Sequence, residues 1–153
     1  MAEMKAITVQ QPWASCIATT APGAKRVENR GQSTTYRGPI LIHAGASISK
    51  TGEADYRCIR IWGTDPAHGR PMRAVLAVAD LVDAHRAENR CCRPWGEEWY
   101  ETRRGTLPAA HLVLDHVRVL DQPIPARGAL GLWTPEPHLV SAVQQQLALA
   151  VTR

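Results

Sequence analysis

Two continuous apolar runs constrain the fold of this chain more than any other feature. One covers residues 38–44 (GPILIHA) and the other covers residues 74–82 (AVLAVADLV). Runs of this length without regular polar alternation are typical of strands buried on both faces. Shorter strand-like segments at residues 6–9, 112–120 and 131–133 complete the pattern. The chain is therefore expected to fold around a sheet.

Helices are expected at two places among these strands. The first begins near Pro12, which suits the first position of a helix, and it must end before Pro22 and Gly23. The second covers residues 53–62, with Tyr56, Ile59 and either Cys58 or Trp62 facing inward. A turn region rich in Gly and Pro follows over residues 64–71.

A third helix begins at Thr134-Pro135 and carries Leu139, Val143, Leu147 and Val151 at a spacing of four residues. This spacing predicts an apolar stripe that docks against the sheet. Residues 86–110 have no clean period and are expected to form a long loop, which in a compact domain is usually functional or mobile.

The length of 153 residues predicts one domain over residues 1–153, with residues 135–151 as an appended C-terminal helix. Short strands with interspersed helices favour an α+β fold, namely a small mixed β-barrel with flanking helices.

No stretch approaches the roughly 20 apolar residues of a membrane helix, and the N-terminus lacks the apolar region of a signal peptide. We expect a cytoplasmic protein without a membrane partner, and the sequence leaves its oligomeric state open.

The net charge of +4 and the pI of about 9.1 favour polyanionic partners such as nucleic acid. The excess of Arg over Lys has an alternative origin in GC-rich codon usage.

The cysteines Cys16, Cys58, Cys91 and Cys92 form no C-x-x-C pair. Cys91-Cys92 could bind a metal together with His85, but ordinary reduced thiols are the expected state, and we predict no metal and no cofactor.

The segment Gly-Ala-Lys-Arg-Val-Glu-Asn-Arg, residues 23–30, concentrates charge in a short stretch. Gly23 can take the positive φ that ends a helix. If residues 27–30 form a strand, Glu28 and Arg30 lie on one face, about 6–7 Å apart along the chain. Lys25, on the preceding turn, can lean over the same patch. Such a site suits an anionic or hydrogen-bond-rich ligand, for example a nucleotide.

These residues resemble the signature Gly-x-Lys-x-x-Glu-x-Arg of the ASCH (activating signal cointegrator homology) domain, a branch of the PUA-like superfamily. The upstream Gln11-Pro12-Trp13, the strand at residues 36–44 and the segment at residues 123–133 are similar to further elements of the family. The resemblance implies a PUA-like β-barrel with helices and a ligand cleft beside the signature. It also implies RNA, a nucleotide or a modified nucleoside as the partner.

Two alternatives stay open, one from the resemblance and one from the tryptophan-bearing segment. Some small ASCH proteins are hydrolases that deacetylate N4-acetylcytidine, and others are ribonucleases; in that case Lys25 and Glu28 would be catalytic. The deacetylases carry Thr where this chain has Glu28, so the chain departs from their pattern. The other alternative is a protein-interaction module that uses the tryptophan-bearing residues 91–100.

Each candidate residue also has a structural alternative. Gln11 either reads a ligand edge or caps the first helix, and Trp13 either stacks on a base or joins the core. Glu28 and Arg30 either bind a ligand or pair with each other. His43 is either cleft-facing or a satisfied core histidine, and Trp95, Glu98 and Trp99 belong to a lid or to a packed loop. The expected ligand-binding residues are Gln11, Trp13, Lys25, Glu28, Arg30, His43, Trp95, Glu98, His111 and Arg127.

Overall fold

The computed structural model describes residues 3–63 and 70–152, so most of the turn region expected at residues 64–71 lies outside the described residues. The chain divides into two compact units. Unit 1 takes the segments Met1–Ala24, Pro39–Ala79 and Val117–Arg153, and unit 2 takes Lys25–Gly38 and Asp80–His116. The expectation of a single domain stays a prediction.

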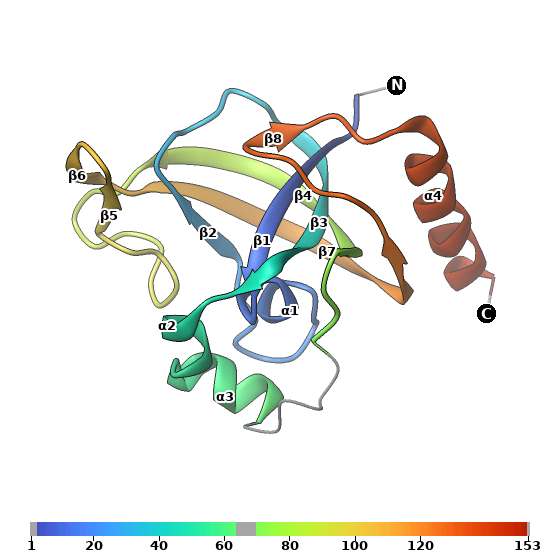
Figure 1. The fold of residues 1–153 in the computed structure, drawn as a ribbon, viewed down its shortest axis with the longest axis horizontal. Helices are drawn as coiled ribbons and strands as arrows, with labels where there is room; N and C mark the ends of the chain where they lie inside the picture. The colour runs from blue at the N-terminus through green and yellow to red at the C-terminus, as the bar shows by residue number, and fades with distance from the viewer. Residues whose placement is uncertain (1–2, 64–69, 153) are drawn as a thin grey trace. The chain divides into compact units, whose positions relative to one another are not determined.

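The strands of unit 1 form a mixed sheet (Figure 1). Strand β1 (Lys5–Gln11) pairs in parallel with β3 (Gly38–Ile48) and antiparallel with β8 (Leu132–Trp133). Strands β4 (Ala74–Arg86) and β7 (Ala110–Pro125) run through both units, and their unit 1 portions complete the order β7-β4-β3-β1-β8. Both apolar runs of the sequence lie in central strands here, since β3 lies between β4 and β1, and β4 lies between β7 and β3.

The C-terminal helix α4 (Pro137–Val151) covers the core of unit 1 (Figure 1). Leu139 and Val143 are buried, and Leu147 packs against the same cluster, which confirms the docking stripe over these positions. Val151 is 85% exposed, so the prediction is wrong at the end of the helix. The remaining buried members of the cluster come from the strands: Ala6, Leu41, Val75, Val78 and Leu120.

The helix expected over residues 53–62 is two helices, α2 (Lys50–Glu53) and α3 (Tyr56–Trp62). The break follows from Asp55, whose carboxylate accepts a hydrogen bond from the Arg57 amide and caps α3. This start places Tyr56 outward at 64% exposure, so its predicted inward orientation is wrong. Cys58, one of the two further inward candidates, is buried. Helix α1 (Trp13–Ile17) is also shorter than expected, with Pro12 at its N-cap.

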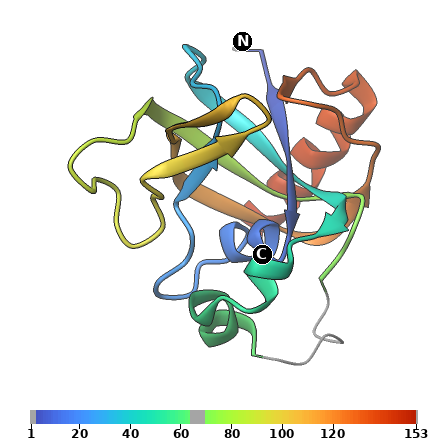
Figure 2. The same ribbon diagram turned by 60° about the vertical axis from the view of Figure 1, so that its left-hand side comes forward.

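Unit 2 is built on β2 (Val27–Arg30), which pairs antiparallel with β7 in the local order β2-β7-β4. A hairpin of β5 (Trp99–Thr102) and β6 (Gly105–Pro108) follows a loop (Figure 2). The prediction of an irregular segment is therefore wrong over these residues. The sequence did not predict the turn at Arg103-Arg104, because the one turn-favouring residue there is Gly105, which has a φ of 118°.

Parallel and antiparallel strands with four helices in the described residues confirm the predicted α+β class. No helix within residues 3–63 and 70–152 is long and apolar enough to cross a membrane.

Candidate functional site

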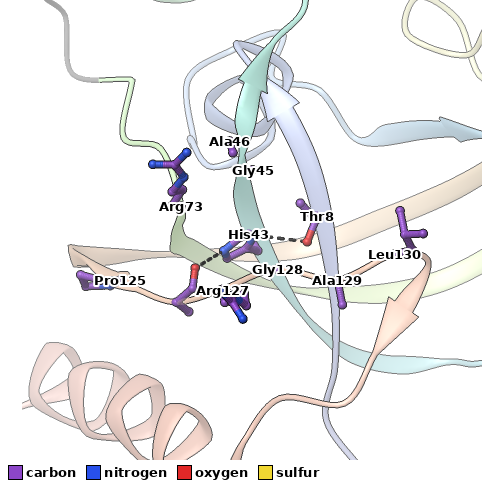
Figure 3. Close-up of a pocket in the computed structure, with 11 residues that line it drawn as sticks. Thr8, His43, Gly45, Ala46, Arg73, Pro125, Arg127, Gly128, Ala129 and Leu130 are labelled. Carbon is purple, nitrogen blue, oxygen red and sulfur yellow. Dashed lines mark hydrogen bonds between the residues drawn. The ribbon is translucent and has the colours of Figure 1, made fainter.

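Unit 1 contains a pocket of about 930 Å³ beside the paired strands β1 and β3 (Figure 3). Its wall is completed by the segment that follows β7. Ligand pockets in proteins commonly have volumes of ~300–1,000 Å³, so a nucleotide fits this size range. The residues that define its chemistry are Thr8, His43, Gly45, Arg73, Arg127 and Gly128.

His43 is fixed in the pocket wall by a network that permits one tautomer (Figure 3). Its Nε2 lies 2.7 Å from the Ala126 carbonyl oxygen, which only accepts, so Nε2 carries the proton and donates. Its Nδ1 then accepts from the Thr8 hydroxyl at 3.2 Å, and that hydroxyl accepts from Trp133 Nε1 at 3.1 Å. Burial lowers the pKa of His43 below its ordinary 6.5, against the opposing hydrogen bond to Ala126. His43 is therefore neutral at pH 7.

Two glycines allow this network to close. A Cβ atom on Gly128 would lie 2.4 Å from Thr8 Oγ1 and 2.8 Å from His43 Cε1. A Cβ atom on Gly45 would lie 2.9 Å from Thr8 Cγ2. The Thr8 side chain is thus confined from two sides by backbone, and neither position has room for a larger residue.

The positive charge of the pocket comes from Arg73 and Arg127, both exposed. Arg73 has a left-handed φ of 54° and is held there by two backbone hydrogen bonds, from its amide to Gly45 and from the Ala126 amide to its carbonyl. Non-glycine residues in this conformation cost free energy and cluster at functional sites. Two guanidinium groups beside a neutral wall can bind the oxygens of an anion such as a phosphate.

The charged groups of the signature meet in unit 2. Glu28 Oε1 lies 3.4 Å from Lys25 Nζ, and Glu28 Oε2 lies 3.0 Å from the Arg30 guanidinium. Lys25 also donates to the Val27 carbonyl, and its ammonium lies 5.6 Å from the centre of the Trp95 ring. The convergence expected from the strand geometry is therefore present.

The accessibility of this cluster is much lower than expected for a ligand cleft. Lys25 is 2% exposed and Glu28 is 8% exposed, whereas the Arg30 side chain is 26% exposed. The pocket of Figure 3 is lined by none of the three. Glu28 pairs with both Lys25 and Arg30, in keeping with the structural alternative, and Arg30 is the most exposed of the three.

Several other candidates have geometries that favour their structural alternatives. Gln11 is fully buried; its amide oxygen accepts from the Ser15 amide in the first turn of α1, and its amide nitrogen donates to Ser15 Oγ and to the Pro71 carbonyl. Trp13 packs against Gly52 so closely that a Cβ there would lie 2.9 Å from its ring. Their ligand roles stay predictions.

The residues expected to form a lid differ in their burial. Trp95 is 4% exposed and its carbonyl accepts from Asn29, so this residue is a packed part of unit 2. Glu98 is exposed, and Trp99 is 59% exposed on β5. His111 is fully buried and bonds the Glu97 carbonyl at 2.6 Å.

Sequence reasoning missed Thr8, Arg73 and Gly128 as parts of the pocket. The pairing of Thr8 with His43 depends on the parallel register of β1 and β3, which no local pattern reveals. It also missed that His111 joins His85, Cys91 and Cys92 in one cluster whose ligand atoms all lie within 4.8 Å of one another. The adjacent cysteines were the available signal.

Comparison with solved structures identifies the fold of the chain. The chain superimposes on the crystal structure of ASCH from Zymomonas mobilis with a TM-score of 0.56, at 17% identity, covering 95% of this chain and 94% of that one. A mutant of that protein, with phenylalanine in place of one tyrosine, gives a TM-score of 0.58 at 16% identity, covering 94% and 98% of the two chains. At these identities the likeness establishes the fold.

A sequence match points the same way. The chain is 34% identical over 82 residues to human activating signal cointegrator 1, a match that covers 50% of this chain. It spans only 14% of that much longer protein. No protein-family model matches the chain.

The fold is therefore PUA-like: an α+β arrangement of a mixed sheet with flanking helices. Within that class it is the fold of ASCH domain proteins, which confirms the resemblance drawn from the signature and its flanking segments.

Proposed function

We propose that this protein binds RNA, and that the pocket of unit 1 receives one nucleotide of the strand. The observation that carries the proposal is the pair of exposed arginines, Arg73 and Arg127, at a pocket of nucleotide size. The basic pI of about 9.1 supplies the long-range attraction for a polyanion.

The pocket offers different surfaces to the two parts of a nucleotide. Arg73 and Arg127 suit a phosphate, because each guanidinium presents paired N–H donors to anionic oxygens. Pro125, Ala129 and the 97% exposed Leu130 provide apolar contact area for a base or a ribose. His43 acts as a wall, since both its ring nitrogens are already engaged.

For the signature we propose a supporting role with one ligand contact. Lys25 and Glu28 hold the start of β2 against Trp95, and Arg30, the most exposed of the three, contacts phosphate. This differs from a cleft in which all three groups bind the ligand.

The hydrolase alternative has less support from the geometry. A general base must reach its substrate, and the ammonium of Lys25 is enclosed by the Val27 carbonyl, Glu28 and the Trp95 ring. Turnover of N4-acetylcytidine or cleavage of RNA, abolished in Lys25→Ala, would establish the alternative.

The proposal is tested by titrating a fluorescently labelled single-stranded RNA and following its anisotropy. We expect Arg127→Ala and Arg73→Gly each to weaken binding about 5–50-fold, or ~1–2.3 kcal/mol, which overlaps the ~1.5–3 kcal/mol of a hydrogen bond to a charged group. Arg60→Ala on α3 is the matched control, because it removes the same charge from unit 1 outside the pocket.

Salt dependence separates phosphate contacts from other contacts. For single strands the logarithm of the binding constant falls with the logarithm of salt concentration with a slope of about −0.7 per phosphate contacted. Removal of the Arg127 guanidinium should make the slope shallower by about 0.7. Equal affinities and slopes for wild type, Arg127→Ala and Arg60→Ala would refute the pocket as the RNA site.

A further inference from the structure

Four metal-ligating side chains meet in unit 2, at a distance in sequence from the signature. They are His85 on β4, Cys91 and Cys92 on the following loop, and His111 on β7. Their ligand atoms, two sulfurs and two imidazole nitrogens, all lie within 4.8 Å of one another. None of the four lines the RNA pocket proposed above, so the cluster requires its own explanation.

Three of the six distances between these ligand atoms are close to the edges of one coordination tetrahedron. Cys91 Sγ lies 3.6 Å from His85 Nε2 and 3.5 Å from His111 Nδ1, and Cys92 Sγ lies 3.3 Å from His85 Nε2. With Zn–S of about 2.3 Å and Zn–N of about 2.0–2.1 Å, a tetrahedral site has S···N edges of about 3.6 Å. Since all four ligand atoms lie within 4.8 Å of one another, small side-chain movements would close them around a tetrahedral ion of this size.

Both histidines are oriented by partners on their other ring nitrogens. His85 Nδ1 lies 2.7 Å from the Asp83 carboxylate, and His111 Nε2 lies 2.6 Å from the Glu97 carbonyl. Each partner accepts a hydrogen bond from the ring N–H, so the opposite nitrogen, Nε2 of His85 and Nδ1 of His111, presents its lone pair to the cluster. Carboxylate and carbonyl partners of this kind accompany histidines that bind zinc.

The loop backbone is bent into the shape that the cluster requires. Asn89, Arg90 and Cys92 have left-handed φ angles of 51°, 57° and 62°. Gly96 passes so close to the cysteines that a Cβ atom there would lie 2.8 Å from Cys92 Cβ. Asn adopts this conformation readily, but Arg90 and Cys92 do so at a cost, and a metal bound to both thiolates would stabilise them.

We propose that His85, Cys91, Cys92 and His111 bind a Zn²⁺ ion. Two thiolates and two imidazoles in tetrahedral array select zinc over Mg²⁺ and Ca²⁺, which take oxygen ligands. Four protein ligands complete the coordination sphere, so the ion is structural and activates no water. It ties the loop to β4 and β7 and so fixes Trp95, whose ring lies over Lys25 and whose carbonyl accepts from Asn29.

The first test is the metal content of the full chain purified without chelators, by inductively coupled plasma mass spectrometry. We expect about one zinc per chain, as a site with four protein ligands implies. Wild-type protein stripped of metal and titrated with Co²⁺ should develop the intense visible d–d absorption of a tetrahedral thiolate site, saturating at a single equivalent. A stripped protein that shows no such absorption with excess Co²⁺ would overturn the proposal.

Variants assign the ligands. Cys92→Ser and His111→Gln should each abolish stoichiometric zinc, and Asp83→Asn, which keeps all four ligands, should weaken zinc about 10–100-fold in competition with a chromophoric chelator. His138→Gln on α4 is the control, because it removes an exposed imidazole outside the cluster. Unchanged zinc affinity in Cys92→Ser and His111→Gln would refute the assignment. The wild-type Co²⁺ titration decides the question even if a ligand variant does not fold.

Discussion

Substitution of Gly128 by alanine should destabilise the pocket by a clash whose size follows from the structure. The added Cβ would lie 2.4 Å from Thr8 Oγ1, about 1 Å inside ordinary contact at 3.4 Å. Thr8 cannot give way easily, since Gly45 confines its methyl group and two hydrogen bonds hold its hydroxyl. Overpacking of this kind costs ~1–3 kcal/mol.

Urea denaturation of wild type and Gly128→Ala measures this cost directly. A loss of ~1 kcal/mol corresponds to about 2–4 °C in the melting temperature of a chain of this size, so thermal melts should shift by roughly 2–12 °C. Ala129→Ser, one residue away and exposed, is the control and should change stability by no more than about 0.5 kcal/mol.

A double-mutant cycle with Thr8→Ala identifies the clash as the cause. Removal of Oγ1 relieves the closest contact, so Gly128→Ala should cost at least ~0.5 kcal/mol less in the Thr8→Ala background than in wild type. Strictly additive effects, or a Gly128→Ala protein as stable as wild type, would refute the proposed packing of the pocket wall.

Three further predictions concern other parts of the molecule. Because burial lowers the pKa of folded His43 below 6.5, the unfolded chain binds this proton first, so stability falls as pH drops from about 6.5 to the folded pKa. The difference in unfolding free energy between wild type and His43→Gln, measured by urea melts, should therefore shrink from about pH 8 to about pH 5. A constant difference would contradict this. Glu28→Gln removes the carboxylate that pairs with buried Lys25 and should lower the unfolding free energy by about 3–5 kcal/mol. Lys25→Met combined with Glu28→Leu should recover most of that stability in the same assay. No recovery would show that the charges do not act as a pair. Arg73→Gly relieves a left-handed φ of 54°, so the variant should be as stable as wild type or up to ~1 kcal/mol more stable, while it binds RNA more weakly. A large loss of stability would contradict the account of strain.

Much of the fold could be predicted because its signals are local. The apolar runs at residues 38–44 and 74–82 mark β3 and β4, and the alternation within residues 27–30 correctly predicts that Glu28 and Arg30 meet. The β5–β6 hairpin was missed because its turn carries two arginines and its strands show no apolar alternation.

The candidate site was harder to predict, because its contacts depend on strand register and burial. The sequence identifies Lys25, Glu28 and Arg30 as a charged group, but charge spacing alone does not reveal that Lys25 is enclosed. His43 was recognised without its partner Thr8, which lies 35 positions earlier and meets it only through the parallel pairing of β1 and β3. In the same way, His111 comes within reach of the cysteines only through the folded strands, whereas His85 was already a candidate partner.

The most direct test of the proposed function is the affinity of a short single-stranded RNA for wild type, Arg127→Ala and Arg60→Ala at several salt concentrations. The account predicts that Arg127→Ala alone weakens binding about 5–50-fold and makes the salt slope shallower by about 0.7. Indistinguishable affinities and slopes for the three proteins would contradict it.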